Sequence, residues 1–283
     1  MKRYLCFMLA AVMLLMLAAC GAPAAPVIET APPAAADAAP AEGGDAGEST
    51  PNISCANTVE VSTVDEFLAA IASDTMIVLA AGNYDLSTAS DYGRAPDGAP
   101  YIWTGVYDSE TESLDTAFEL AISNVDKLAI VAAPDANVTI SAVPRYANVL
   151  SFYDCGGILL RGVTVGHTEE PGECSGGVLN FQRCNDILID ACRLYGCGIV
   201  GVSAFDSSSL TVKDTEIYEC SNAAVTLWSV SGAVFDNCNI YNCGTPELVL
   251  TDSSTTYNGT ALKSLDYSLE NGVPVEYVYP GIH

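Results

Sequence analysis

The chain has 283 residues, 50% of them hydrophobic, and its 35 acidic side chains against 10 basic ones give a formal net charge of −25. This charge excludes nucleic-acid binding through basic contacts to phosphate and argues against docking on anionic lipid. Acidic surfaces are common on exported proteins, so solubility alone explains the charge.

The N-terminus has the pattern of an export signal. Lys2 and Arg3 precede a short apolar run that ends in LAAC, with Cys20 last. The run is too short to span a bilayer, so residues 1–19 are predicted to be a signal peptide. The LAAC ending resembles the bacterial lipobox, which implies cleavage before Cys20 and lipidation of that cysteine. An ordinary signal peptide cut nearby is the alternative, and both interpretations predict export.

The next segment, residues 20–54, is rich in Ala, Pro, Gly and acidic side chains and has almost no large apolar ones. Such a segment cannot bury enough surface to fold, so it is predicted to be a flexible tether. The remainder, residues 55–283, has the size of one domain. We expect a monomer outside the cytoplasm, held on the bilayer by the lipidated Cys20.

The start of this domain predicts a capping helix. In STVDEFLAAIAS, Thr63 and Glu66 have the spacing of a capping box, and Phe67, Leu68 and Ile71 share one helical face. The following MIVLAAGNYDLS predicts the first strand and a glycine turn. A short helix over the open end of a sheet prevents edge-to-edge aggregation.

A long connection between Ser87 and Asp115 places aromatic side chains among carboxylates. Aromatic faces beside carboxylates suit sugar rings, and long loops in compact domains are often functional. The candidate ligand-binding side chains are Tyr92, Tyr101, Trp103 and Tyr107. The alternative is an ordered flap whose aromatic residues pack on the domain.

The rest of the domain is a repeat. The segments NDILIDACRLYGCG, SSLTVKDTEIYECS and GAVFDNCNIYNCG overlay at a period of 23 residues, and GGILLRGVTVGHT joins them at a spacing of 29. Apolar and polar positions alternate, which is the period of a strand, and stacked repeats would align the apolar positions into one core. The predicted core columns are Ile158/Ile187/Leu210/Ala233, Leu160/Ile189/Val212/Phe235 and Val165/Leu194/Ile217/Ile240.

This pattern resembles the right-handed parallel β-helix of the pectate-lyase-like superfamily, over about residues 116–250. The resemblance implies an all-β fold, a right-handed parallel β-helix solenoid with an N-terminal capping helix. It implies little about activity, because function is grafted onto such scaffolds.

Charged residues and cysteines also fall into columns. Alternating signs predict a ladder of ion pairs that fixes the stacking register, along Arg161, Asp190, Lys213 and Asp236. Coils stacked about 4.8 Å apart are slightly too far apart for the usual Cβ separation of a disulfide, so buried thiols are predicted instead. The cysteine columns are Cys155/Cys184, Cys197/Cys220/Cys243 and, interrupted by Thr215, Cys192/Cys238.

Two aromatic columns are further candidates for ligand contact. Tyr195, Tyr218 and Tyr241 each follow an inward aliphatic residue, so alternation points them outward. The direction of a second column is ambiguous between an interior stack and an outward glycan-binding stripe. Its members are Phe152, Phe181, Phe205 and Trp228.

The stretch GHTEEPGECSGGVLNF holds His167, the only histidine apart from the last residue of the chain. In register, the stretch is an enlarged acidic turn between two coils. Glu169, Glu170 and Glu173 are candidate Ca²⁺ ligands, and His167 is a candidate acid or base. His167, Glu169 and Glu170 are also candidate ligand contacts, and no cofactor other than Ca²⁺ is expected.

In polysaccharide lyases of this superfamily, the resemblance implies acidic residues on the exterior of the first strand and an Arg or Lys base. The corresponding strands here offer only Asp154, Arg183 and Asp206 at their ends. These three residues, with His167 and Glu173, are the candidates if the protein is a polysaccharide lyase or glycoside hydrolase acting on acidic polysaccharide. The main expectation is a non-enzymatic surface protein that binds cell-envelope or environmental glycan. A structural or adhesin-like surface protein is a further alternative.

Overall fold

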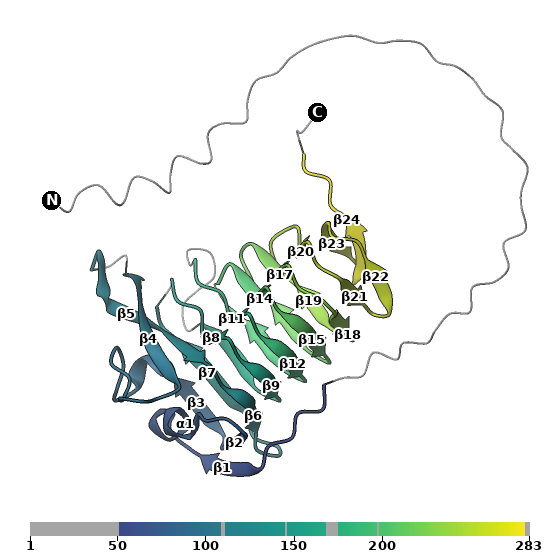
Figure 1. Cartoon of the computed structure of the whole chain (residues 1–283). Helices are drawn as coiled ribbons and strands as arrows, with labels where there is room; N and C mark the ends of the chain where they lie inside the picture. Colours follow the sequence, from purple (N-terminus) through teal and green to yellow (C-terminus); the bar gives the residue numbers. More distant parts are fainter. Residues whose placement is uncertain (1–50, 109–110, 145, 168–174, 197, 281–283) are drawn as a thin grey trace, which may run out of the picture. The chain divides into compact units, whose positions relative to one another are not determined.

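The computed structural model describes residues 51–280 except 109–110, 145, 168–174 and 197. The described residues belong to one compact unit, Glu48–His283. Within it the chain passes through three sheets in the same order, coil after coil (Figure 1).

The three sheets are named A, B and C here. Sheet A contains, in pairing order, β1 (Asn57–Val61), β2 (Thr75–Leu79), β6 (Asp126–Ala132), β9 (Gly156–Arg161), β12 (Asn185–Asp190), β15 (Ser208–Lys213), β18 (Ala233–Asp236), β21 (Thr255–Tyr257) and β22 (Thr260–Leu262). Sheet B contains β3 (Gly82–Asp85), β7 (Val138–Ala142), β10 (Thr164–His167), β13 (Arg193–Tyr195), β16 (Glu216–Tyr218) and β19 (Asn239–Tyr241). Sheet C contains β4 (Tyr101–Asp108), β5 (Ser113–Ser123), β8 (Leu150–Tyr153), β11 (Leu179–Gln182), β14 (Val200–Phe205), β17 (Ala223–Trp228), β20 (Leu248–Thr251), β23 (Asp266–Glu270) and β24 (Val273–Glu276).

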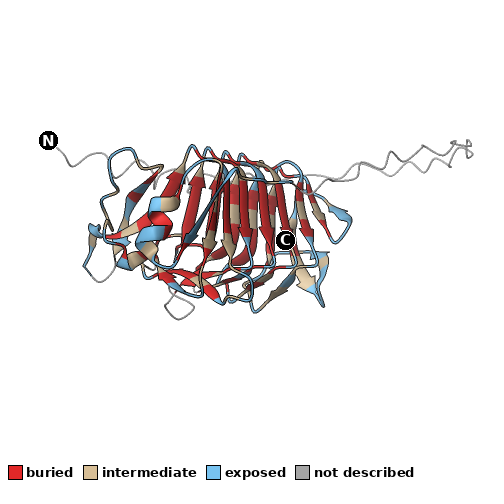
Figure 2. Ribbon diagram, turned by 90° about the horizontal axis from the view of Figure 1, so that it is seen from below, coloured by how far each residue is buried: buried red, intermediate tan, exposed pale blue. Residues whose placement is uncertain are grey.

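The predicted interior columns are confirmed. Ile187 pairs with Ile158 on one side and Leu210 on the other, and all three side chains are fully buried. The buried faces of successive strands form one continuous core (Figure 2). Each aliphatic side chain buried in this way stabilises the fold by about 1.5–3 kcal/mol relative to exposure. The other two predicted columns are also in register, with Ile240 half-buried at the end of its column.

The corners between sheets C and A depend on left-handed backbone at equivalent positions. These positions are occupied by Asp154 (φ 54°), Arg183 (φ 53°) and Asp206 (φ 47°). The side chain that follows is buried and donates to the carbonyl two residues earlier: Cys184 to Gln182 (3.4 Å) and Ser207 to Phe205 (2.8 Å). The Cys184 N–H in turn donates to Ser207 Oγ of the next coil, at 3.0 Å. Cysteine and serine therefore make the same side-chain bond at this corner, to carbonyls that also accept the backbone N–H of the preceding coil, and Ser207 additionally satisfies the buried N–H of Cys184.

The predicted ladder of charges is confirmed for Arg161, Asp190 and Lys213, and Asp236 lies in register with Lys213. Asp190 lies between Arg161 and Lys213, at 2.8 Å and 3.4 Å. A second ion pair between coils, Arg193 with Glu216, is 2.9 Å apart. Because the cationic side chains are largely exposed, these pairs fix register more than they add stability.

The proposed column of Phe152, Phe181, Phe205 and Trp228 is wrong as a single column. Phe181 stacks on Phe152 inside the core, with ring centroids 5.2 Å apart. Phe205, however, pairs with Gln182 below and Trp228 above, on the outer face. The cause is the 24-residue spacing between Phe181 and Phe205, since an offset of one residue moves a side chain to the opposite face of a strand.

Helix α1 (Val64–Ala70) begins at the predicted N-cap. Thr63 Oγ1 accepts the Glu66 N–H at 3.2 Å, while the Glu66 carboxylate accepts the N–H of Ser62 at 2.8 Å, one residue before the cap. Phe67 and Leu68 are buried against the first coil. Strand β1 precedes the helix and pairs with β2, outside the predicted strands.

The predicted long connection between Ser87 and Asp115 contains regular structure. A short 3₁₀ helix, η1 (Leu86–Thr88), is followed by β4, which pairs antiparallel with the long strand β5 and adds a hairpin to sheet C. At the C-terminal end of the solenoid, β21–β22 and β23–β24 are antiparallel hairpins, so the parallel stacking of coils stops there.

The register of sheet C can be tested with two matched substitutions. We expect Phe181→Ala to lower the free energy of unfolding by about 3–5 kcal/mol, because it leaves a cavity in the core. Phe205→Ala, on the outer face, is expected to cost under about 1 kcal/mol. Urea unfolding measures both, and equal losses for the two variants would contradict the assigned register.

Candidate functional site

The outer face of sheet C carries two neighbouring columns without charged side chains between β8 and β20. The first column is Ser151, Asn180, Ser203, Thr226 and Val249. The second column is Tyr153, Gln182, Phe205, Trp228 and Thr251. This face combines hydroxyl, amide and aromatic side chains in a protein that is otherwise strongly acidic.

Trp228 is the most exposed aromatic side chain of this face, at 54%. No other aromatic ring among the described residues contacts its indole. Phe205, next to it on the preceding coil, is half-buried, as are Ser203 and Thr226 in the neighbouring column. We call Gln182, Ser203, Phe205, Thr226 and Trp228 the sheet C patch.

Toward the N-terminal end, the same face is closed by a hydrogen-bond network. The buried carboxylate of Glu119 accepts from Ser151 Oγ (2.6 Å), the Asn148 N–H (2.8 Å) and Asn148 Nδ2 (3.1 Å). Asn180 Nδ2 donates to Ser151 Oγ (3.2 Å), and Ser203 Oγ donates to Asn180 Oδ1 (3.2 Å). Several donors offset the cost of burying the carboxylate, so this network rigidifies the support of the sheet C patch.

The charged candidates lie at the edge of this face, where Arg183 binds Asp154 through two parallel hydrogen bonds of 2.6 and 2.7 Å. Arg183 lowers the pKa of Asp154 through these hydrogen bonds, and the carboxylate raises the pKa of Arg183. A general base needs a pKa near the working pH, so this shift is opposite to what a basic role for Arg183 requires. Asp206 occupies the equivalent corner of the next coil and further raises the pKa of Arg183.

The aromatic residues of the flap mostly pack on one another. Tyr101 and Trp103 are only 4% and 8% exposed, and both donate to Asp91, at 2.6 Å and 3.4 Å. Tyr92 packs edge-on against Trp103, with ring centroids 5.0 Å apart. The expectation that Tyr101 and Trp103 form an open sugar platform is therefore corrected: they are the core of the flap. Tyr107 is 46% exposed and packs edge-on against Tyr146.

Tyr195, Tyr218 and Tyr241 point outward from sheet B, as alternation predicts. Their rings stack face to face, with centroids 5.8 Å and 5.1 Å apart. Arg193 lies 5.6 Å from the Tyr218 ring centroid. Gly166 leaves the room that the Tyr195 ring occupies, since a Cβ there would collide with it. The ring faces within this tyrosine ladder are occupied by neighbouring residues, so a ligand would meet mainly ring edges and hydroxyls.

His167 is a corner residue of the interior, which corrects its predicted place in an enlarged surface turn. It pairs with Ala142 in sheet B and is 1% exposed. Its Nε2 donates to the carbonyl of Gly177 at 3.1 Å, while Nδ1 has no hydrogen-bond partner among the described residues. Burial lowers the pKa of His167, although the Gly177 carbonyl that accepts from Nε2 opposes the shift. A neutral, enclosed imidazole is poorly placed for acid–base chemistry on an external substrate.

The predicted Ca²⁺ ligands Glu169, Glu170 and Glu173 lie outside the described residues, as does Cys20. Within the described part of the chain, no cluster of three or more His, Cys, Asp or Glu side chains has the geometry of a metal site. None of the helices described there is long and apolar enough to cross a membrane.

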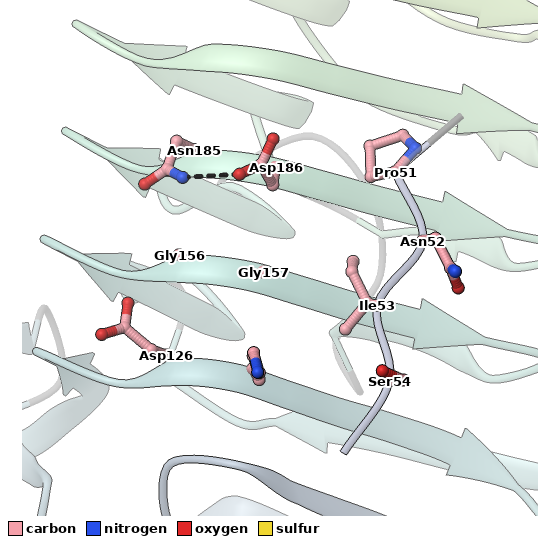
Figure 3. A pocket seen from close by; sticks show the side chains of 10 residues that line it. Pro51, Asn52, Ile53, Ser54, Asp126, Gly156, Gly157, Asn185 and Asp186 are labelled. Carbon is pink, nitrogen blue, oxygen red and sulfur yellow. Dashed lines mark hydrogen bonds between the residues drawn. The ribbon is translucent and has the colours of Figure 1, made fainter. Parts of the chain in front are cut away.

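A groove lies on the outer face of sheet A, where Pro51–Ser54 crosses the strands (Figure 3). Its floor includes Gly156 and Gly157, and Asn185 Nδ2 donates to Asp186 at its rim, at 2.8 Å. Ile53 packs there on an apolar cluster of Ala129, Leu159 and Leu188. The groove thus belongs to the attachment of the N-terminal segment to the solenoid.

The polar column of sheet C was not among the features predicted from the sequence. Its signal is present: Ser151, Asn180 and Ser203 recur at the same spacings of 29 and 23 residues as the core. The hydrogen bond from this column to Glu119 could not be predicted from the repeat spacing, because Glu119 lies on strand β5, which is not part of the repeat.

The buried imidazole makes a pH prediction. The unfolded chain protonates His167 near its ordinary pKa of 6.5, whereas the folded protein resists protonation because the pKa is lowered. The free energy of unfolding is therefore unaffected by His167 above about pH 7, and it decreases as the pH drops through 6. His167→Gln keeps an N–H donor toward Gly177 and should flatten this dependence in urea unfolding between pH 7.5 and 5.5. An unchanged dependence in the variant would rule out His167 as its source.

A comparison with protein families agrees with the fold. Residues 129–266 match the family model described as the right-handed β-helix region. No curated protein matches the chain significantly. Among solved structures the chain is similar to a pectate lyase (pelN) from Paenibacillus sp. 0602, with 12% identity and a TM-score of 0.33. That alignment covers 64% of this chain and 38% of the lyase, so the chain spans well under half of the lyase's length. The described domain is a right-handed parallel β-helix.

Proposed function

We propose that this β-helix binds a neutral glycan on the sheet C patch. The observation that carries the proposal is the exposed Trp228 within an uncharged outward face of a chain with net charge −25. On the outer face of sheet A, by contrast, the column of Arg161, Asp190 and Lys213 carries the charges of the ion-pair ladder.

The aromatic half of the patch suits the apolar face of a sugar ring. Phe205 and Trp228 are neighbours on adjacent strands, so their Cα atoms lie about 4.8 Å apart. An exposed indole offers a flat surface on which the C–H groups of a pyranose can pack. A linear glycan lying along the stack of coils would meet both residues in turn.

The polar half of the patch supplies hydrogen bonds at fixed positions. Thr226 and Ser203 pair on neighbouring strands, beside the aromatic column. The Ser203 hydroxyl is oriented by Asn180 and by the Leu179 carbonyl, each at 3.2 Å. Hydroxyl and amide groups held on a rigid sheet can both donate hydrogen bonds to sugar hydroxyl groups and accept hydrogen bonds from them.

The charge of the protein favours a neutral ligand over a polyuronide. A chain with 35 acidic and 10 basic residues repels an anionic polymer, and Arg183, which follows Gln182 of the patch, is already paired with Asp154. The same pairing weighs against a lyase or hydrolase that uses Asp154, Arg183 and Asp206.

The proposed location is the outside of the cell, on a membrane anchor. The signal-like residues 1–19, the LAAC ending and the Ala/Pro-rich segment 20–54 support an exported lipoprotein tethered through Cys20. Such a tether would leave the solenoid free to reach cell-envelope or environmental glycan.

Glycan binding can be tested by screening neutral and acidic oligosaccharides on an array and measuring the best ligand by calorimetry. Trp228→Ala should weaken that ligand roughly two- to tenfold, since an aromatic contact contributes about 0.5–1.5 kcal/mol. Tyr241→Ala, an aromatic residue of the sheet B ladder, is the matched control and should leave the affinity unchanged.

Three outcomes would overturn this proposal. Loss of binding in Tyr241→Ala alone would move the site to the tyrosine ladder. Absence of any glycan bound at millimolar concentration would favour a structural or adhesin-like role. Unsaturated or reducing ends released from a polyuronide, with or without Ca²⁺, would make the protein an enzyme.

The anchor makes a separate prediction. Cys20→Ser should shift the protein from the membrane fraction to the soluble fraction of the producing cell, because the acyl chains can no longer be attached. Cys55→Ser, the matched control within the domain, should stay in the membrane fraction. A Cys20→Ser protein that remains in the membrane would contradict lipid anchoring at this residue.

A further inference from the structure

Two buried cysteines are stacked on successive coils at the corner between sheets C and A. Cys155 and Cys184 are 2% and 1% exposed, and both are free thiols. They occupy equivalent positions, since the Asn185 N–H donates to the Cys155 carbonyl at 3.0 Å, in the parallel pattern of β9 and β12.

The two thiols have the same orientation. Cys155 Sγ donates to the carbonyl of Tyr153 at 3.2 Å, and Cys184 Sγ donates to that of Gln182 at 3.4 Å. Adjacent strands place equivalent Cα atoms about 4.8 Å apart, inside the 4.4–6.8 Å range of disulfides. A Cβ separation near 4.8 Å exceeds the common range only slightly, so a small approach of the two corners suffices for a bond.

Within their column, Cys155 and Cys184 can form a disulfide only with each other, because the residues on either side of them are not cysteines. Val125 precedes Cys155 in the column, and Ser207 follows Cys184. Cys192 and Cys238, in another column, are separated by the coil that carries Thr215, so they lie about 9.6 Å apart and cannot be bridged.

We propose that Cys155 and Cys184 form a redox-active dithiol that closes to a disulfide when the chain folds in the presence of an external disulfide. The Cys155 thiolate attacks the external disulfide and releases one thiol. The Cys184 thiolate then attacks the mixed disulfide on Cys155 and releases the second. Two electrons and two protons pass from the cysteine pair to the external disulfide, which becomes two thiols.

The environment of the pair supports this order of attack. The Cys184 thiol lowers the pKa of Cys155 by hydrogen bonding to its thiolate, whereas the pKa of Cys184 is raised. The thiolate is the nucleophile in exchange, so Cys155 is the residue that begins the reaction. Because the pair is enclosed once folding is complete, the exchange takes place as the two coils come together, when the thiols are already neighbours but the external disulfide can still reach them.

The bond would join two coils covalently around an enlarged segment of the chain. It closes a loop of 29 residues, which includes β9, β10 and the stretch before β11. Cross-linking such a loop stabilises the folded state mainly by restricting the unfolded chain. The same stacked geometry recurs at Cys220 and Cys243, where the Gly244 N–H donates to the Cys220 carbonyl at 2.9 Å.

The test is to refold the full chain from urea with oxidised and reduced glutathione, and in parallel with a strong reductant. Remaining thiols are alkylated in denaturant, and tryptic peptides are identified by mass spectrometry. The oxidised sample should yield a peptide cross-linked between Cys155 and Cys184, with Cys192 and Cys238 alkylated. Full alkylation of Cys155 and Cys184 in that sample would overturn the proposal.

Thermal unfolding of cysteine variants is a second test of the disulfide. Oxidation should raise the Tm by roughly 5–10 °C, and this rise should shrink in the variant Cys155→Ser/Cys184→Ser. Serine is tolerated because Ser207 already fills the same corner position. Cys192→Thr, which repeats the residue that Thr215 places in the same column, is the control and should keep the full rise. A rise that is undiminished in the double-serine variant would also overturn the proposal.

Discussion

Parallel stacking of coils in strict register is the constraint on which the rest of this structure depends. In a stack of parallel strands, each strand forms its backbone hydrogen bonds with the equivalent strands of the coils on either side, so each turn of the chain must bend at the same places as the last. The bends are made by left-handed residues such as Asp154 and Arg183, and the side chains of Cys184 and Ser207 donate to the carbonyls two residues before them. Every column, interior or exterior, follows from that repetition.

The same repetition explains what could be predicted from the sequence. Columns such as Ile158/Ile187/Leu210 are visible because a 23- or 29-residue spacing applies to all of their members. The grouping of Phe205 with Phe181 failed because their spacing is 24, and one residue decides between core and surface. The burial of His167 and of the flap residue Trp103 could not be predicted, because both depend on contacts with segments that do not repeat.

Register also distinguishes the two exposed aromatic surfaces. In the sheet B ladder, identical residues on three coils must stack, so Tyr218 has Tyr195 on one side and Tyr241 on the other. In sheet C, the column changes from residue to residue, and Trp228 stands between Phe205 and Thr251 with its indole open to solvent. A repeated aromatic column therefore favours internal stacking, whereas an irregular one leaves a ring free for a ligand.

Recognition of a neutral glycan by the sheet C patch is the central claim, and the two tryptophans of the chain allow it to be observed without mutation. In a ¹⁵N-labelled sample, the indole N–H groups of Trp228 and Trp103 give separate NMR signals, and Trp103 is enclosed in the flap. During titration with a neutral oligosaccharide, the Trp228 signal should shift in a saturable way while the Trp103 signal stays in place. Saturable binding that leaves the Trp228 signal unmoved would contradict the account.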